Sequence, residues 1–183
     1  MAEEGNVISN LRADTLGGIA NGADTAPAAG IITQYVKDLS VENPNAPESL
    51  SWTDTPTLDV QFNIAARAIP GVNPGELHEI ELKVTLNAKA EAGTAYIVDL
   101  SYCALIGMRN LDEANMHAFL FAEAPRLTFP FARRVVADAV RDAGFPAFML
   151  EPIDFNGLYL QQIAQAQAEA EAQAAQGEPA GNA

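Results

Sequence analysis

Four segments before residue 110 alternate apolar and polar side chains with the period of a half-buried β-strand. They span residues 35–42, 58–64, 80–88 and 94–106. Residues 43–47, which contain two prolines, end the first segment abruptly, because proline cannot donate to a β-ladder. The other segments follow one another through short links that contain glycine or proline. The pattern predicts a four-stranded antiparallel sheet.

After residue 110 the apolar period changes to that of an α-helix. A short helix is expected over residues 111–123, and Pro125 and Pro130 are expected to interrupt the chain after it. A second helix is expected over residues 131–143. Gly144 follows at the C′ position, where glycine adopts the left-handed conformation without strain.

The two ends of the chain differ in composition from its middle. Residues 1–30 are rich in Gly, Ala, Asn and Asp and predict a flexible leader. Residues 164–183 are mostly Ala, Gln and Glu, so a final helix that begins at Phe155 or Asn156 is expected to run into this tail. The predicted domain therefore spans 31–163 and is α+β, with a four-stranded antiparallel sheet followed by two or three helices packed on one face.

The first strand carries two acidic side chains on one face. Regular alternation divides it into Tyr35, Lys37, Leu39 and Val41 on one side and Val36, Asp38, Ser40 and Glu42 on the other. Two carboxylates on a strand face beside a rigid proline turn are typical of a docking surface. They do not indicate a catalytic centre.

Charge excludes one class of partner. The chain has 10 Lys and Arg against 24 Asp and Glu, which gives a net charge of −14. Such a protein repels phosphate backbones, so we expect no nucleic acid as a partner. The charge is explained either by solubility or by steering of a basic partner. The shared face of Asp38 and Glu42 favours steering.

The expected compartment is the cytoplasm. No run of about 18 apolar residues is present, so we expect no insertion into a membrane. The acidic start Met1-Ala2-Glu3-Glu4 is unlike a signal peptide. The single cysteine, Cys103, cannot form an internal disulfide, which suits a reducing compartment.

Residues with catalytic chemistry are scarce. His78 and His117 are the only histidines, and neither forms a recognisable triad with a nucleophile. Glu113 and His117 have helical spacing but lack further metal ligands. Cys103 lies in a strand without cationic neighbours in sequence, which predicts an inert buried thiol. We expect no enzyme activity, catalytic residue, metal or cofactor, and no ATP-binding motif is present.

Three further blocks follow the first strand in a fixed order: Pro125-Arg126-Leu127-Thr128-Phe129-Pro130-Phe131-Ala132-Arg133, then residues 144–146, then residues 152–159. Together with residues 35–47 they resemble the SecB-type protein-export chaperones over roughly residues 31–162. The resemblance implies a chaperone that holds unfolded precursor proteins without ATP and delivers them to the SecA translocation ATPase.

The resemblance also implies where SecA docks. In the family, two acids of the first strand and a Leu-x-Glu of the last strand bind the basic, zinc-bearing C-terminal tail of SecA. The matching positions here are Asp38, Glu42, Ile97 and Asp99. Ile replaces Leu and Asp replaces Glu. Each exposed charge pair is expected to contribute about 0.2–1 kcal/mol.

Client binding and assembly are implied in the same way. The expected apolar groove for clients is lined by Trp52, Leu58, Val60, Phe62, Phe155 and Tyr159. The expected assembly is a homotetramer, a dimer of dimers, which would also cover the sheet edge. One departure from the family is Tyr102-Cys103-Ala104 in place of a glycine pair. Another is the helix start at residues 154–158, which keeps an Asp or Asn for capping.

Two alternatives remain from the sequence. A SecB-like chaperone dedicated to a single client, such as an antitoxin, would keep the groove but lack the translocase contact. A small-molecule-binding protein or enzyme on an α+β sheet would close the groove into a pocket. The acidic set on the two strands favours the export chaperone.

Overall fold

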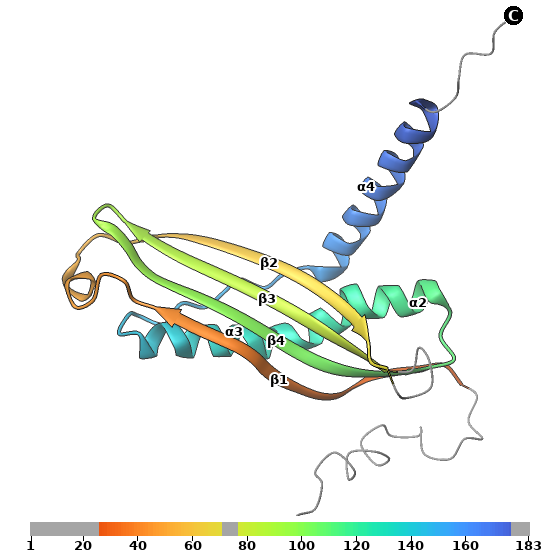
Figure 1. Ribbon diagram of the computed structural model, residues 1–183, viewed down its shortest axis with the longest axis horizontal. Coiled ribbons are helices and arrows are strands. Elements are labelled where there is room, and N and C mark those ends of the chain that lie inside the picture. Colours follow the sequence, from red (N-terminus) through yellow and green to blue (C-terminus); the bar gives the residue numbers. More distant parts are fainter. Residues whose placement is uncertain (1–25, 71–76, 177–183) are drawn as a thin grey trace, which may run out of the picture.

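The predicted sheet is present in the computed structural model of the chain, which describes residues 26–70 and 77–176. Its strands are β1 (Ala28–Glu42), β2 (Thr57–Ala68), β3 (Leu77–Ala90) and β4 (Gly93–Arg109). All neighbouring strands are antiparallel, and their order in the sheet is β1-β4-β3-β2 (Figure 1). The prediction of a four-stranded antiparallel sheet is therefore confirmed.

The connection between β1 and β2 carries the chain from one edge of the sheet to the other. It contains the 3-10 turn Glu48–Ser51. The Asn43 Nδ2 donates to the carbonyl oxygen of Ala143 at 3.2 Å, and the Asn45 Nδ2 donates to that of Thr94 at 2.9 Å. These bonds fasten the connection to a helix end and to the start of β4.

A continuous helical run follows the sheet. It consists of α2 (Glu113–Ala118), a π-helical turn (Phe119–Glu123) and α3 (Ala124–Asp142). The predicted interruption at Pro125 and Pro130 is wrong. Pro125 lies in the first turn of α3, directly after the π-helical turn, where the missing N–H costs least. Pro130 is accepted inside α3, where the missing N–H removes a backbone hydrogen bond.

The end of α3 is as predicted. Gly144 has a φ of +94°. Its N–H donates to the carbonyl oxygen of Arg141 at 3.0 Å, and the N–H of Phe145 donates to that of Val140 at 3.3 Å. These two bonds form a Schellman motif, which satisfies carbonyl groups that the helix leaves free.

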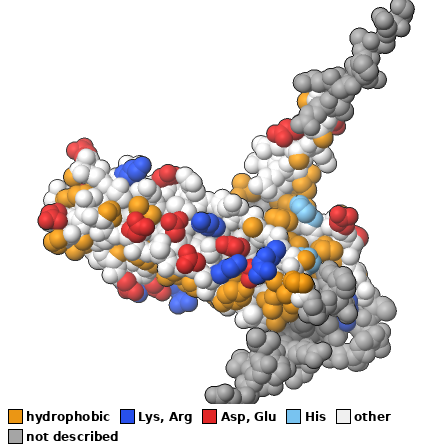
Figure 2. Space-filling view, viewed as in Figure 1, with side chains coloured by type: hydrophobic (Ala, Val, Ile, Leu, Met, Phe, Trp, Pro, Cys, Tyr) orange, Lys and Arg blue, Asp and Glu red, His pale blue; other side chains and the backbone are white. Residues whose placement is uncertain are grey.

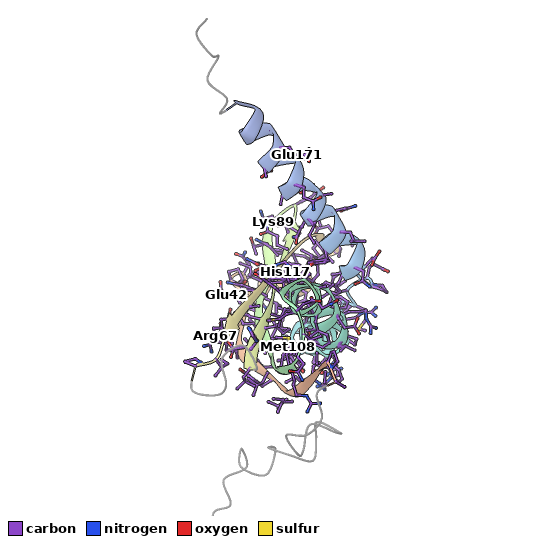
Figure 3. All side chains as sticks on the ribbon, turned by 90° about the vertical axis from the view of Figure 1, so that its right-hand side faces the viewer. Glu42, Arg67, Lys89, Met108, His117 and Glu171 are labelled. Atoms are coloured by element: carbon purple, nitrogen blue, oxygen red, sulfur yellow. The ribbon has the colours of Figure 1, made fainter. Side chains whose placement is uncertain are left out.

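The helices cover one face of the sheet. The main core contains alternate residues of β3 and β4 packed against α3, among them Leu82, Val84, Leu86, Val98, Leu100, Phe129, Ala132, Val136 and Val140. Figure 3 looks along the sheet and shows the helices on one side, with Glu42 and Arg67 on the other side. The face away from the helices is called the open face below.

A bulge in β1 changes the faces that regular alternation predicts. Val36 lies opposite Tyr102 and Asp38 lies opposite Ser101, so Lys37 is an extra residue between the two pairs. One extra residue reverses the alternation of every side chain beyond it.

The predicted grouping of Tyr35 and Lys37 with Leu39 and Val41 is therefore wrong. Leu39 and Val41 lie opposite Leu100 and Val98 of the core, on the helix-covered side. Tyr35 and Lys37 contact Glu79 on the open face instead. Asp38, Ser40 and Glu42 do share one face, and it is the open face.

The final helix, α4 (Phe155–Gln176), begins where it was expected. Figure 1 shows that it projects away from the sheet. It crosses the predicted boundary between 31–163 and 164–183 without a break, and β1 begins inside the predicted leader 1–30. Residues 1–25 of that leader lie outside the described residues. None of the described helices is long and apolar enough to span a membrane.

Candidate functional site

The open face of the sheet is mostly polar, and none of the described helices covers it. Alternate residues of all four strands form it, including Asp38, Ser40, Glu42, Asp59, Gln61, Asn63, Lys83, Thr85, Asn87, Ile97, Asp99 and Ser101. Figure 2 looks onto this face and shows acidic side chains spread across it, with Lys and Arg side chains between them. The described residues of this face offer a partner a polar, largely acidic surface.

The four residues predicted to dock SecA lie together on the open face. Glu42 is directly opposite Ile97, and Ser40 is directly opposite Asp99 on the neighbouring strand. Asp38 lies one open-face position further along β1. Asp99 is therefore the diagonal neighbour of both Asp38 and Glu42, at a spacing of about 7–8 Å, so the three carboxylates form one group. Asp38, Glu42, Ile97 and Asp99 are called the docking patch below.

One member of the docking patch is oriented by a neighbour. The Thr85 hydroxyl donates to Oδ1 of Asp99 at 2.6 Å, from the directly opposite position on β3. A short bond of this kind fixes the carboxylate of an aspartate, whose side chain is one carbon shorter than the family's glutamate. The sequence alone does not indicate the role of Thr85, because alternation does not set the register between β3 and β4.

A second polar cluster on the open face surrounds Glu79. Only 5% of the surface of Glu79 is exposed. Oε1 of Glu79 accepts from Nζ of Lys37 at 2.8 Å and from Nε of Arg67 at 2.9 Å. Its Oε2 accepts from the hydroxyl of Tyr35. Lys37 also lies 3.5 Å from Oε2 of Glu81. The cluster joins β1, β2 and β3 across β4, and no pattern in the sequence predicts it.

The contacts around Glu79 change its proton affinity and that of Tyr35. The hydrogen bond from Arg67, followed by those from Lys37 and Tyr35, lowers the pKa of Glu79 to about 2 against the opposing effect of burial. Burial and the hydrogen bond to Glu79 raise the pKa of Tyr35 to about 12. At neutral pH the cluster therefore contains an ionised carboxylate held by two cations and a neutral phenol.

Cys103 lies on β4 beneath this cluster and is fully buried. Burial raises the pKa of its thiol to about 11, and Glu79 adds to this effect. In the described part of the chain, potential metal ligands gather at Glu79, Glu81 and Cys103, within 4.8 Å of one another. Because Lys37 and Arg67 already neutralise Glu79 and the thiol stays protonated, these residues fit an ion-pair cluster better than a metal site.

The residues predicted for client binding do not all meet in one place. Trp52 lies at the β3–β4 turn, where its Cη2 would be 3.6 Å from a Cβ added at Gly93. Trp52 packs against the main core, as do Leu58 and Val60 on the helix-covered side of β2. These three form the apolar margin of the sheet along its β2 edge.

Two of the predicted client residues are joined through Phe129. Phe62 on β2 is 38% exposed, and its ring centroid lies 6.0 Å from that of Phe129 in an edge-on arrangement. Phe155 contacts the same ring at 5.5 Å, but it is only 2% exposed. Phe62 is thus accessible to a client, whereas Phe155 belongs to the core as the structure stands.

Tyr159 lies in a different pocket. Its hydroxyl is 3.0 Å from Nδ1 of His117 on α2. It lines a cavity of about 600 Å³ together with residues that include Leu111, Phe119 and Leu160. This cavity separates the base of α4 from α2 and the π-helical turn, and Trp52 does not line it.

The β1 edge of the sheet exposes apolar side chains on the helix-covered side. Val36, Leu39 and Val41 are all exposed there. Further along β1, Ile31 and Ile32 line a groove of about 460 Å³ with α3 residues that include the exposed Phe131. An edge strand with apolar side chains and an adjacent apolar groove is typical of a protein–protein interface.

Comparison with known proteins identifies relatives that span the whole chain. The family model described as preprotein translocase subunit SecB matches residues 22–166. A protein-export protein SecB of Novosphingobium aromaticivorans is 63% identical, and the alignment covers all of both chains. One from Erythrobacter litoralis is 54% identical, also over the whole of both chains. One from Sphingopyxis alaskensis is 53% identical over 89% of this chain and 91% of its own.

A solved structure shares the fold. It is a SecB-like chaperone of Mycobacterium tuberculosis in complex with an antitoxin peptide, with a TM-score of 0.56 and 18% identity. The match covers 68% of this chain and 90% of that chain. At this identity the likeness supports the arrangement of sheet and helices, and the predicted α+β class is confirmed.

Proposed function

Since this chain belongs to the SecB family, and is therefore a protein-export chaperone and not an enzyme, we propose that it holds unfolded precursor proteins in the cytoplasm and passes them to SecA. Holding would be passive, because the sequence contains no ATP-binding motif. Release would then follow from hand-over to the ATPase. The two activities need two surfaces, one for the client and one for SecA.

The docking patch is the proposed surface for the zinc-bearing C-terminal tail of SecA. The observation that carries this proposal is the convergence of Asp38, Glu42 and Asp99 on one solvated strand face, with Ile97 beside Glu42. Carboxylates so spaced attract the basic groups of the tail, and Ile97 offers an apolar contact among them. Such pairs speed association and select for charge, although each contributes little free energy.

Replacing both acids of β1, Asp38→Asn with Glu42→Gln, should weaken binding of the zinc-loaded SecA tail roughly two- to thirtyfold, because two exposed charge pairs are lost. Affinity for an unfolded client should not change. Isothermal titration calorimetry measures both. The matched control is Glu169→Gln with Glu171→Gln, which removes the same charge from the exposed part of α4. An equal loss in the control would mean that net charge, and not the patch, attracts the tail.

The proposed client surface follows the β2 edge, on the helix-covered side of the sheet. Trp52, Leu58, Val60 and Phe62 lie along this edge and are partly or largely accessible. Aromatic side chains suit a client surface because they bury large areas with few rotatable bonds and need no fixed partner sequence. Tyr159 would belong to a separate contact beside α4, and Phe155 would support the surface from the core.

Trp52→Ala should weaken binding of a permanently unfolded polypeptide by roughly fivefold, since an aromatic contact is lost at the proposed surface. Binding of the SecA tail should stay within about twofold, because the docking patch lies on the opposite face. Fluorescence anisotropy of a labelled, reduced and alkylated polypeptide measures the first value. Unchanged client affinity with a lowered free energy of unfolding would make Trp52 a lid on the core instead.

The proposed assembly is a homotetramer. Exposed apolar side chains on β1 and the groove beside Phe131 support it, because a second copy would cover both and pair the unprotected strand edge. Several weak client sites on one tetramer would also raise affinity through effective concentration. Sedimentation velocity should show a tetramer, and a stable monomer at micromolar concentration would overturn this proposal.

A further inference from the structure

The bulge at Lys37 decides whether the docking patch exists. In a regular β1 the alternation would continue unbroken from Val36. Asp38 and Glu42 would then face the helices, and Leu39 and Val41 would face solvent. With the bulge, Asp38 pairs with Ser101 and the acids reach the open face.

Burial of apolar side chains contributes little to holding β1 in the bulged register. Leu39 and Val41, which the bulge turns toward the helix-covered side, remain exposed on the edge strand. Because Leu39 and Val41 each keep about 41% of their surface exposed in one chain, the hydrophobic effect opposes a slip by one residue only in part. Another interaction must hold the extra residue in place.

The cluster around Glu79 supplies that interaction. Tyr35, before the bulge, and Lys37, at the bulge, both bond the same buried carboxylate. In a regular ladder Lys37 would instead take the position opposite Ser101, whose other neighbour is Lys83 on β3. The slip would therefore leave a buried carboxylate with fewer donors, which is unfavourable, and it would place Lys37 and Lys83 on either side of Ser101.

We infer that Glu79 is a positioning residue for the docking patch: its bond to Lys37 holds the β1 bulge and so keeps Asp38 and Glu42 on the open face. Glu79 does not belong to the patch itself. This inference rests on the proposed function for its binding consequence, but the strand register can be measured without any partner.

Glu79→Ala should weaken binding of the zinc-loaded SecA tail by about tenfold, similar to the loss of the two β1 acids. Nuclear Overhauser effects should report the slip, with backbone contacts of Asp99 moving from Ser40 to Leu39. Glu79→Gln keeps an oxygen that accepts from Lys37, so its affinity should stay within about threefold. Glu81→Ala, which removes only the longer contact to Lys37, is the matched control and should keep the register.

Deletion of Lys37 distinguishes an effect of Glu79→Ala on the register of β1 from an effect on the stability of the whole fold. Without the extra residue, regular alternation itself places Asp38, Ser40 and Glu42 on the open face. Deleting Lys37 in Glu79→Ala should therefore restore tail affinity to within about twofold of the deletion alone. Wild-type affinity of Glu79→Ala, or a loss that the deletion does not repair, would overturn the inference. If the wild-type protein does not bind the SecA tail, the docking proposal fails. The role of Glu79 in the β1 register is then still tested by whether the backbone contact between Ser40 and Asp99 persists in Glu79→Ala.

Discussion

Phe155→Ala should lower the free energy of unfolding by about 3–5 kcal/mol, because it empties a buried aromatic site. Phe155 begins α4 and is 2% exposed, with its ring edge-on to Phe129 at 5.5 Å. Truncation removes apolar contacts, this ring pair and the attachment of α4 to the sheet layer. Urea unfolding followed by circular dichroism, at a fixed protein concentration, measures the change.

The control for this substitution lies on the same helix. Leu160 is 65% exposed, so Leu160→Ala should change the free energy of unfolding by less than about 0.5 kcal/mol. If Phe155→Ala leaves stability near that of the wild type but reduces client affinity, Phe155 lines the client groove as the family resemblance implied. The geometry favours a core role.

Glu79→Gln should lower the free energy of unfolding by roughly 2 kcal/mol at neutral pH. It should also make the free energy of unfolding depend less on pH below about pH 4.5. The pKa of Glu79 is about 2 in the folded chain against an ordinary value of 4.5. A lowered pKa means that ionised Glu79 stabilises the fold. This stabilisation is complete above about pH 4.5 and is lost as the pH falls toward 2.

Thermal or urea unfolding between pH 7 and pH 2.5 tests this dependence. The difference between wild type and Glu79→Gln should be largest above pH 4.5 and should shrink toward pH 2. Glu81→Gln is the control on the same strand face, since among the described residues Glu81 pairs only with Lys37, at 3.5 Å. A constant difference at every pH would show that Glu79 contributes through packing and not through its charge.

The sheet could be predicted largely because β3, one of its two central strands, alternates strongly. Ile80, Leu82 and Val84 of β3 are fully buried and their neighbours are more exposed, so period two is visible in the sequence. The end of α3 was also readable, because Gly144 takes a conformation with positive φ that glycine favours. Features set by local chemistry were therefore predicted well.

The faces of β1 could not be predicted in full. Both sides of this edge strand are exposed beyond Gln34, so hydrophobicity does not mark where alternation reverses. The bulge depends on Lys37 reaching Glu79, which lies 42 residues away in sequence. The predicted interruption at the two prolines was wrong for a related reason. A π-helical turn precedes Pro125, and the apolar period of the sequence does not reveal such a turn.

The sequence named the residues of the docking patch, whose binding role stays a prediction, but it did not name the residues that support them. The acids of the docking patch came from a family resemblance, and the structure places them on one open face. Thr85, which orients Asp99, and Glu79, which bonds Lys37, lie on a third strand. Their roles depend on the register of three strands, and a single sequence does not carry that information.

The most direct test of the central claim is calorimetric binding of the protein to the isolated, zinc-loaded C-terminal tail of SecA at low and moderate salt. We predict micromolar or tighter binding that weakens as salt is added, because exposed charge pairs are screened. Absence of binding at low salt, by a protein that still holds a panel of unfolded polypeptides, would contradict docking to SecA. That result would instead indicate a SecB-like chaperone dedicated to a particular client.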